Sequence, residues 1–203
     1  MKVYFDNAAT TPLRIEVINS INNCMKDHFG NPSSSHSFGR SNKSLLENAR
    51  KSIASNINAN ESEIIFTSGG SESNNSILRC STRDLGVKTI ISSPTEHYAV
   101  LRVLDSLENE GINIEYVKLD EFGNPDMENL EEILSSNDDV KMVSLMHVNN
   151  EVGNLLDIEK TVKLCKSYKS YFHTDSVQAI GHFRFDLKST PIDFLSASAH
   201  KFH

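Results

Sequence analysis

The chain has 203 residues, of which 38% are hydrophobic and 23% are charged, a globular composition that disfavours disorder, collagen and coiled coils. Lys and Arg number 20 against 27 Asp and Glu, a net charge of −7, so we expect no direct nucleic-acid partner. Its apolar runs fall well short of the roughly 18 residues that span a bilayer, and the N-terminus lacks the apolar region of a secretory signal. These features predict a soluble, cytoplasmic protein without a membrane partner.

Three cysteines, Cys24, Cys80 and Cys165, form neither a CxxC pair nor an even framework, which fits a reducing compartment. Each lies in a helix-like segment, so we interpret all three as small core-facing hydrophobic residues rather than reactive thiols. The histidines show no HxH or HxxxH ligand spacing, and no metal site is predicted.

The first 60 residues predict two helices, over residues 13–28 and 44–57, because apolar residues recur there at helical spacing. The turn-rich stretch GNPSSSH, residues 30–36, separates them. No repeat, linker or low-complexity tract divides the chain, so a single domain over residues 1–203 is expected.

Short β-rich runs then alternate with helical patterns such as residues 98–110. Their starts are about 20 to 30 residues apart, the length that a strand and a crossover helix need. This spacing predicts an α/β protein with a parallel sheet. The predicted strands are residues 63–66, 89–93, 114–117, 141–146, 171–174 and 192–195.

Ligands of open parallel sheets bind beyond the carboxyl ends of the strands, so the residues there carry the functional signal. After the first predicted strand, Gly69 and Gly70 would let backbone N–H groups approach an anion, and Ser71 adds a hydroxyl. This stretch resembles a phosphate cradle, although it is neither a Walker A loop nor GxGxxG. An ordinary strand-to-helix connection with a serine N-cap is the alternative.

Two further residues add to this signal. Asp175 follows the strand at 171–174 and would be partly desolvated in the ligand crevice, although a helix N-cap is an alternative role. Lys201 follows the next strand, where a buried amine is uncommon, although an exposed surface charge is the alternative. An anion cradle, a carboxylate and an amine together match the needs of pyridoxal phosphate.

Seven stretches of the chain carry a further signal: Phe5–Pro12, Phe29–Ser34, Phe66–Asn75, Thr95–His97, Met146–Gly153, His173–Gln178 and Ser196–His203. In this order, along essentially the whole chain, they resemble the signatures of NifS/IscS-type cysteine desulfurases, which are class V aminotransferase-like enzymes of fold-type I. The resemblance implies a three-layer α/β sandwich with a mostly parallel sheet. This would be the incomplete large domain of that fold, with an N-terminal helical segment over residues 1–60.

The resemblance also implies roles around pyridoxal phosphate. Lys201 would bind the cofactor as an imine and later move protons, and Asp175 would keep the pyridine nitrogen protonated. Gln178 would hydrogen-bond the phenolate oxygen of the ring. His97 would stack on the ring with an acid or base role, although without the resemblance a capping or surface histidine is the expected reading.

The remaining implied contacts concern the phosphate and the substrate. Asn150 would lie near the cofactor ring and the substrate carboxylate. The phosphate would be bound by Gly70, Ser71, Ser198 and His200.

Members of the family are about twice as long as this chain. In them the lysine is followed by an antiparallel strand inside the sheet, and the second half carries the cysteine that receives sulfur as a persulfide, an arginine for the substrate carboxylate and residues shared across a homodimer. None of Cys24, Cys80 or Cys165 matches that cysteine. We therefore expect the cofactor-binding half of an enzyme that converts L-cysteine to L-alanine, inactive by itself.

The resemblance further implies a homodimer and a sulfur-acceptor protein that serves iron–sulfur cluster assembly or tRNA thiolation. Two alternatives remain open from the sequence. One is another class V pyridoxal enzyme, such as a selenocysteine lyase or an aminotransferase, which would keep Lys201, Asp175 and His97. The other is a truncated, cofactor-free binding module.

Overall fold

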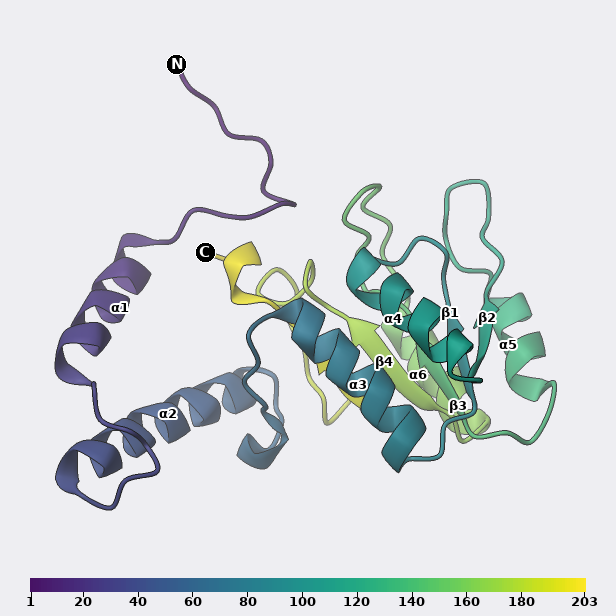
Figure 1. Ribbon diagram of the computed structural model, residues 1–203. Coiled ribbons are helices and arrows are strands. Elements are labelled where there is room, and N and C mark those ends of the chain that lie inside the picture. Colours follow the sequence, from purple (N-terminus) through teal and green to yellow (C-terminus); the bar gives the residue numbers. More distant parts are fainter. The chain divides into compact units, whose positions relative to one another are not determined.

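The computed structural model describes residues 1–203 (Figure 1). The chain divides into two compact units. Unit 1 comprises residues 1–66, 184–189 and 200–203, and unit 2 comprises residues 67–183 and 190–199. No helix is both long and apolar enough to cross a bilayer.

Unit 1 contains the two predicted N-terminal helices, α1 (Ile15–Asp27) and α2 (Ser37–Asn56). Helix α2 begins earlier than the predicted residue 44, because the His36 side chain caps it by accepting a hydrogen bond from the Gly39 N–H, at 3.3 Å. The short 3₁₀ helix η1 (Glu61–Glu63) follows.

The predicted strand over residues 63–66 is wrong. Residues 64–66 form no ladder, and the Ile65 and Phe66 side chains are 81% and 46% exposed. The Arg50 guanidinium instead donates to the Ile64 carbonyl and lies 4.9 Å from the centre of the Phe66 ring. Apolar β-branched residues form a strand only where a neighbouring strand pairs with them, and the described chain places none here.

Unit 2 is built on a five-stranded, wholly parallel sheet with the order β2-β1-β3-β4-β5. Because β1 lies between β2 and β3, the chain runs in one direction across the sheet from β1 to β2 and in the other from β3 to β5. This reversal is a topological switch point. The other five predicted strands are confirmed to within two residues, as β1 (Thr89–Ser92), β2 (Asn113–Tyr116), β3 (Lys141–Ser144), β4 (Tyr171–Asp175) and β5 (Phe194–Ser196).

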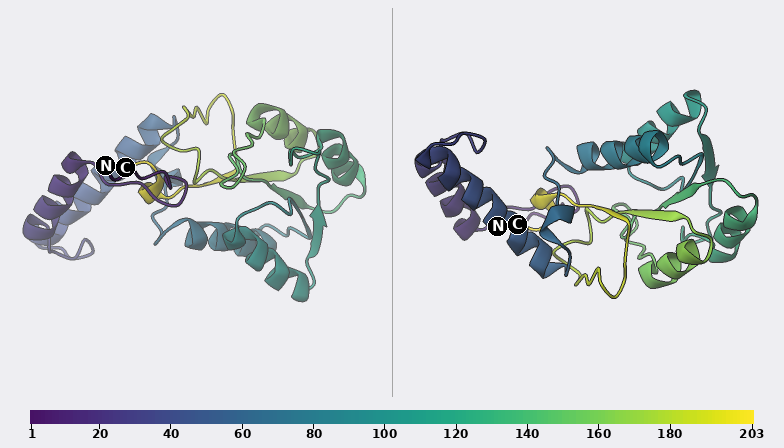
Figure 2. Two further views of the ribbon diagram at one scale, coloured as in Figure 1. Left: turned by 90° about the horizontal axis from the view of Figure 1, so that it is seen from above. Right: turned by 90° about the horizontal axis from the view of Figure 1, so that it is seen from below.

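Helices cover both faces of this sheet, as Figure 2 shows. Helices α3 (Gly70–Asp84) and α4 (Tyr98–Asn109) pack on one face, and α5 (Met127–Ser135) and α6 (Ile158–Ser167) pack on the other. The result is the expected three-layer α/β arrangement.

The core of unit 2 follows from the alternation of side chains along each strand. Ile90 and Met142 are fully buried in the cluster that includes residues of α3 and α4. Their neighbours Ile91 and Val143 are equally buried in the cluster on the α5 and α6 side. Strands that are buried on both faces fix the plane of the sheet and hence the positions of the loops at its carboxyl edge.

The expectation that all three cysteines face the core is confirmed only for Cys165, which is 1% exposed. Burial raises the pKa of its thiol to about 12, so it is unreactive. Cys80 is exposed, because α3 turns Leu78 and Ser81 toward the core instead. Cys24 is partly exposed on α1, a helix without buried residues.

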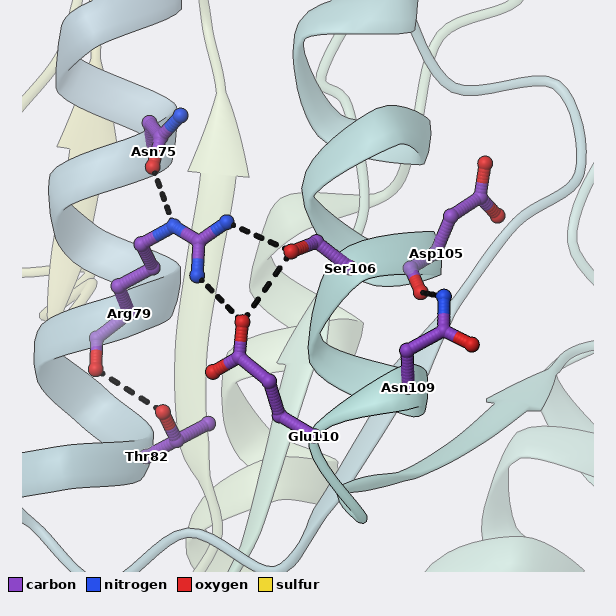
Figure 3. A network of polar contacts seen from close by, with 7 residues as sticks. All are labelled: Asn75, Arg79, Thr82, Asp105, Ser106, Asn109 and Glu110. Carbon is purple, nitrogen blue, oxygen red and sulfur yellow. Dashed lines mark hydrogen bonds and ion pairs between the residues drawn. The ribbon is translucent and has the colours of Figure 1, made fainter.

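A polar network joins α3 to α4 (Figure 3). The Arg79 guanidinium donates to Glu110 Oε1, Ser106 Oγ and Asn75 Oδ1, each at 2.9 Å. Surface ion pairs contribute only about 0–1 kcal/mol, so the network orients α3 more than it stabilises the fold.

Candidate functional site

Polar groups gather at the carboxyl edge of the unit 2 sheet, where the strands hold neighbouring loops together. The His147 N–H donates to the Asp175 carbonyl at 2.9 Å, which joins the ends of β3 and β4. The Ser176 N–H donates to the Ser196 carbonyl at 2.9 Å, which joins β4 to β5. The residues that follow these strands therefore share one edge, as ligand-binding residues of open parallel sheets do.

The Asp175 carboxyl group is held from two sides. Asp175 is only 6% exposed, and its Oδ2 accepts a hydrogen bond from Asn74 Nδ2 at 2.7 Å. Its Oδ1 accepts from the Val177 N–H at 3.0 Å, and no helix follows, so Asp175 forms a turn and is not a helix N-cap. Two neutral donors fix the direction of the carboxylate. Sequence reasoning gave Asn74 no role, although an asparagine on the inner face of α3 was the available signal.

Gly70, at the first position of α3, lies against the loop after β4 and the residue Ser198. A Cβ atom on Gly70 would lie 2.9 Å from Val177 Cγ2 and 3.7 Å from Ser198 Cβ. A Cβ atom on Gly69 would meet nothing within 4 Å. The structure thus brings Gly70 and Ser198 together at the N-terminus of a 15-residue helix, where backbone N–H groups favour an anion. Ser71 is exposed in the first turn of that helix.

His97 is exposed and is the N-cap of α4, because its Nδ1 accepts a hydrogen bond from the Ala99 N–H at 3.1 Å. This is the capping geometry that a lone histidine predicts. It also means that the neutral ring carries its proton on Nε2, which can donate a hydrogen bond.

Asn150 and Gln178 are both half-buried and lie in loops at the same edge. Asn150 follows β3, and its Nδ2 donates to Glu151 Oε1 at 2.6 Å. Gln178 comes directly after the turn that Asp175 forms with Val177.

In unit 1, the N-terminal segment holds the end of the chain. Lys201 Nζ donates to the Ala8 carbonyl. The His200 carbonyl accepts from both the Thr11 N–H and Thr11 Oγ1, at 2.9 Å each, and Thr11 Oγ1 accepts from the His203 N–H at 2.8 Å. Sequence reasoning assigned no role to Thr11, which is buried; the adjacent threonine pair in the Phe5–Pro12 motif was the available signal.

The nine predicted site residues therefore divide between the units. His200 and Lys201 belong to unit 1. Unit 2 contains the other seven: Gly70, Ser71, His97, Asn150, Asp175, Gln178 and Ser198.

A buried row of polar side chains crosses unit 2 from the sheet to α3. Ser144 Oγ lies 2.9 Å from His173 Nδ1, and His173 Nε2 lies 3.3 Å from Ser196 Oγ. Ser196 Oγ in turn lies 2.8 Å from Ser73 Oγ on α3. Burial lowers the pKa of His173 to about 3, so the ring is neutral and bridges two hydroxyl groups.

This neutral histidine predicts a pH dependence of stability. The unfolded chain takes up a proton on His173 near its ordinary pKa of 6.5, whereas the folded chain resists until about pH 3. Its contribution to the free energy of unfolding is therefore complete above pH 6.5 and is lost progressively down to about pH 3. Denaturant titrations between pH 7 and 4 should show a shallower loss for His173→Asn than for the unsubstituted protein, roughly within this window. The control His182→Asn removes an exposed histidine and should keep the pH dependence of the unsubstituted protein. If the stability of His173→Asn falls with pH as steeply as that of the unsubstituted protein, the assignment is contradicted.

The comparisons with known proteins agree on one family. The class V aminotransferase family model matches residues 3–203. Similar curated proteins are a cysteine desulfurase IscS of Dictyoglomus turgidum, 45% identical over 100% of this chain and 51% of its own length, and a putative cysteine desulfurase IscS 1 of Bacillus subtilis, 42% identical over 98% and 53%. The chain spans about half the length of these relatives.

Solved structures agree with this fold. A NifS-like protein superimposes with a TM-score of 0.94 and 37% identity, covering 100% of this chain and 56% of its own. A structure described as SspA in complex with cysteine gives a TM-score of 0.91 and 33% identity, covering 98% and 57%.

Proposed function

Because the chain belongs to the class V aminotransferase family, among the cysteine desulfurases of the IscS/NifS type, we propose that it is the cofactor-binding half of a pyridoxal phosphate-dependent cysteine desulfurase. The reaction would convert L-cysteine to L-alanine and pass the sulfur on. Activity belongs to the complete polypeptide, by which we mean one with the length of the curated relatives.

The described residues fit pyridoxal phosphate. Gly70 leaves no room for a Cβ atom beside Val177, so glycine lets the N-terminus of α3 pack against the loop after β4, and the N–H groups of a helix N-terminus favour an anion. Asp175 supplies a buried, oriented carboxylate. Beside it, Asn74 Oδ1 and Ser176 Oγ are buried without a hydrogen-bond partner, and such atoms often mark a site that a further group completes.

We assign the holding residues accordingly. Lys201 would bind the cofactor covalently through Nζ, and Gln178 would hydrogen-bond its phenolate oxygen. When bound, pyridoxal phosphate would supply an electron sink for negative charge at the substrate Cα. The phosphate group would be bound by Gly70, Ser71, Ser198 and His200.

Side chains of this chain would then hold and transfer the protons of the reaction. The Asp175 carboxylate, held by Asn74 and Val177, would keep a proton on the pyridine nitrogen. Lys201 Nζ would remove and return protons at the substrate Cα, and His97 would act as a second acid or base. Asn150 would orient the substrate carboxylate.

The sulfur-receiving cysteine would lie in the remaining part of the complete polypeptide. Cys165 does not suit that task, because it is buried and its thiol pKa is raised to about 12. L-Cysteine as substrate is supported by the similar structure described as a complex with cysteine. A homodimer and a sulfur-acceptor protein, for iron–sulfur clusters or tRNA thiolation, complete the proposal.

The observation that carries this proposal is the Asp175 carboxylate fixed at the carboxyl edge beside Gly70 and Val177, in a chain 45% identical to a cysteine desulfurase. The test is turnover of L-cysteine by the complete polypeptide with pyridoxal phosphate and a thiol reductant. Equal amounts of alanine and sulfide are expected. Pyruvate without sulfur transfer, amination of a keto acid, or activity confined to selenocysteine would favour another class V enzyme.

The phosphate assignment predicts a difference between two neighbouring glycines. Gly70→Ala places a methyl group 2.9 Å from Val177 Cγ2. Relieving this overpacked contact would displace the N-terminus of α3 and its N–H groups, so the Kd for pyridoxal phosphate should rise roughly tenfold. Gly69→Ala has open space and should leave the Kd unchanged. Absorbance titration of the cofactor-free proteins measures both values. Equal Kd values for the two variants would remove Gly70 from the phosphate site.

A further inference from the structure

Two buried polar side chains bridge the loops that follow β1 and β3. Glu96 is 6% exposed, and its Oε1 accepts a hydrogen bond from the Met146 N–H at 2.7 Å. Asn149 is 8% exposed, and its Nδ2 donates to the Thr95 carbonyl at 2.9 Å. We name this pair of side chains, Glu96 and Asn149, the interloop clamp.

The clamp lies at the topological switch point of the sheet. Strands β1 and β3 are neighbours there, but the loops that leave them lead to opposite sides of the sheet, which opens the crevice used by ligands of such folds. The two bonds of the clamp cross this opening. Asn149 also orders its own loop, because its Oδ1 accepts from the N–H groups of Glu151 and Val152, at 2.9 and 3.0 Å.

Each clamp residue directly precedes a residue of the proposed site. Glu96 is followed by His97, and Asn149 is followed by Asn150. A side chain fixed at one position restricts the backbone of the next, so the clamp restrains the spacing between the backbones of His97 and Asn150.

The surroundings of Glu96 indicate its charge. Its Oε2 is buried without a hydrogen-bond partner, and none of the ion pairs in the structure includes Glu96. The charged group that acts on it is Asp175 at the end of β4, which carries the same sign. Burial raises the pKa of Glu96 well above its ordinary value, and the charge of Asp175 raises it further, although the hydrogen bond from the Met146 N–H acts in the opposite direction. The fold therefore favours the uncharged form of Glu96.

We propose that Glu96 and Asn149 are positioning residues, which hold the His97 loop and the Asn150 loop at the working distance across the switch point, with Glu96 acting as an uncharged hydrogen-bond acceptor. The inference rests on the proposed function for the roles of His97 and Asn150. The clamp itself rests only on contacts within unit 2.

Two substitutions of similar size separate this role from a catalytic one. Glu96→Gln keeps an uncharged acceptor for the Met146 N–H and should retain kcat and KM for L-cysteine within about twofold in the complete polypeptide. Glu96→Leu removes the acceptor and loosens the loops, so it should lower kcat/KM by about 10- to 100-fold, the effect expected of a displaced catalytic group. Asn149→Ala should act in the same direction. The double variant Glu96→Leu with Asn149→Ala should lose less than the product of the single losses, because both remove one clamp.

A second readout needs no activity and uses the cofactor-free protein. Since the folded chain keeps a proton on Glu96 that the unfolded chain releases above about pH 4.5, the unsubstituted protein should lose stability relative to Glu96→Gln as pH rises from 4.5 to 8. Denaturant titrations at several pH values give this difference. If Glu96 is ionised in the folded protein, the stability difference between the two proteins would not increase with pH.

The outcomes are distinct. A Glu96→Gln variant that loses activity as severely as Glu96→Leu, with no pH-dependent difference in stability, would show that Glu96 works as a charged or proton-transferring group and would overturn the proposal. Unchanged kinetics in both Glu96→Leu and Asn149→Ala would overturn it as well. If the complete polypeptide neither binds pyridoxal phosphate nor consumes L-cysteine, the proposed function fails, while the stability difference still decides whether Glu96 is neutral.

Discussion

Replacing Lys201 by alanine in the complete polypeptide is expected to abolish the visible absorption of bound pyridoxal phosphate and to lower L-cysteine turnover on the order of 100- to 10,000-fold. The reason is that Lys201 Nζ would both hold the cofactor covalently and move the proton at the substrate Cα. The substitution removes the hydrogen bond from Lys201 Nζ to the Ala8 carbonyl, but the neighbouring backbone stays held by the bond from Thr11 Oγ1 to the His200 carbonyl and should tolerate the change. Absorbance spectra and alanine formation measure the two effects.

A matched control is Lys118→Ala, which removes an exposed lysine of the described chain. This variant should keep both the absorption and the turnover of the unsubstituted protein. A Lys201→Ala variant that retains the absorption band and turns over L-cysteine at the control rate would contradict the assignment of Lys201.

The second large effect concerns Asp175→Asn. This substitution keeps the shape of the side chain, and an amide can still accept from Asn74 or Val177, but it removes the negative charge. The loss of a charge-assisted hydrogen bond of about 1.5–3 kcal/mol should lower kcat/KM for L-cysteine roughly 10- to 100-fold. The absorption maximum of the bound cofactor should also shift, because the pyridine nitrogen would no longer keep its proton. Steady-state kinetics and spectra of the complete polypeptide test both points.

Asp157→Asn is the control for this substitution. Asp157 is an exposed N-cap of α6 whose Oδ1 accepts from the Lys160 N–H at 2.9 Å, and asparagine caps a helix about as well as aspartate. It should therefore leave the kinetics and the spectrum unchanged. If Asp175→Asn behaves like this control, Asp175 does not face the pyridine nitrogen.

The sheet could be predicted from the sequence where strands bury both faces. Ile90 with Ile91 and Met142 with Val143 are fully buried, and runs of this kind give a strong local signal. Residues 63–66 carry the same signal but form no strand, because pairing depends on a neighbouring strand and not on the run itself. The resemblance implies an antiparallel strand after Lys201, inside the sheet, and such a strand would be a neighbour of this kind.

The candidate site could be predicted in part, for a related reason. Residue types with unusual chemistry at strand ends, such as Asp175 and the glycines before α3, can be recognised in the sequence. Their supports cannot, because contacts such as Asn74 with Asp175, or Glu96 with Met146, join positions far apart in the chain. Asn74 and Glu96 look like ordinary polar residues until the fold buries them.

Covalent binding of pyridoxal phosphate to Lys201 can be trapped chemically. The complete polypeptide is saturated with pyridoxal phosphate, reduced with borohydride and digested, and its peptides are identified by mass spectrometry. A reduced pyridoxyl phosphate adduct is expected on Lys201 and none on the control residue Lys118. The absence of an adduct, or an adduct on another lysine instead of Lys201, would contradict covalent binding through Lys201.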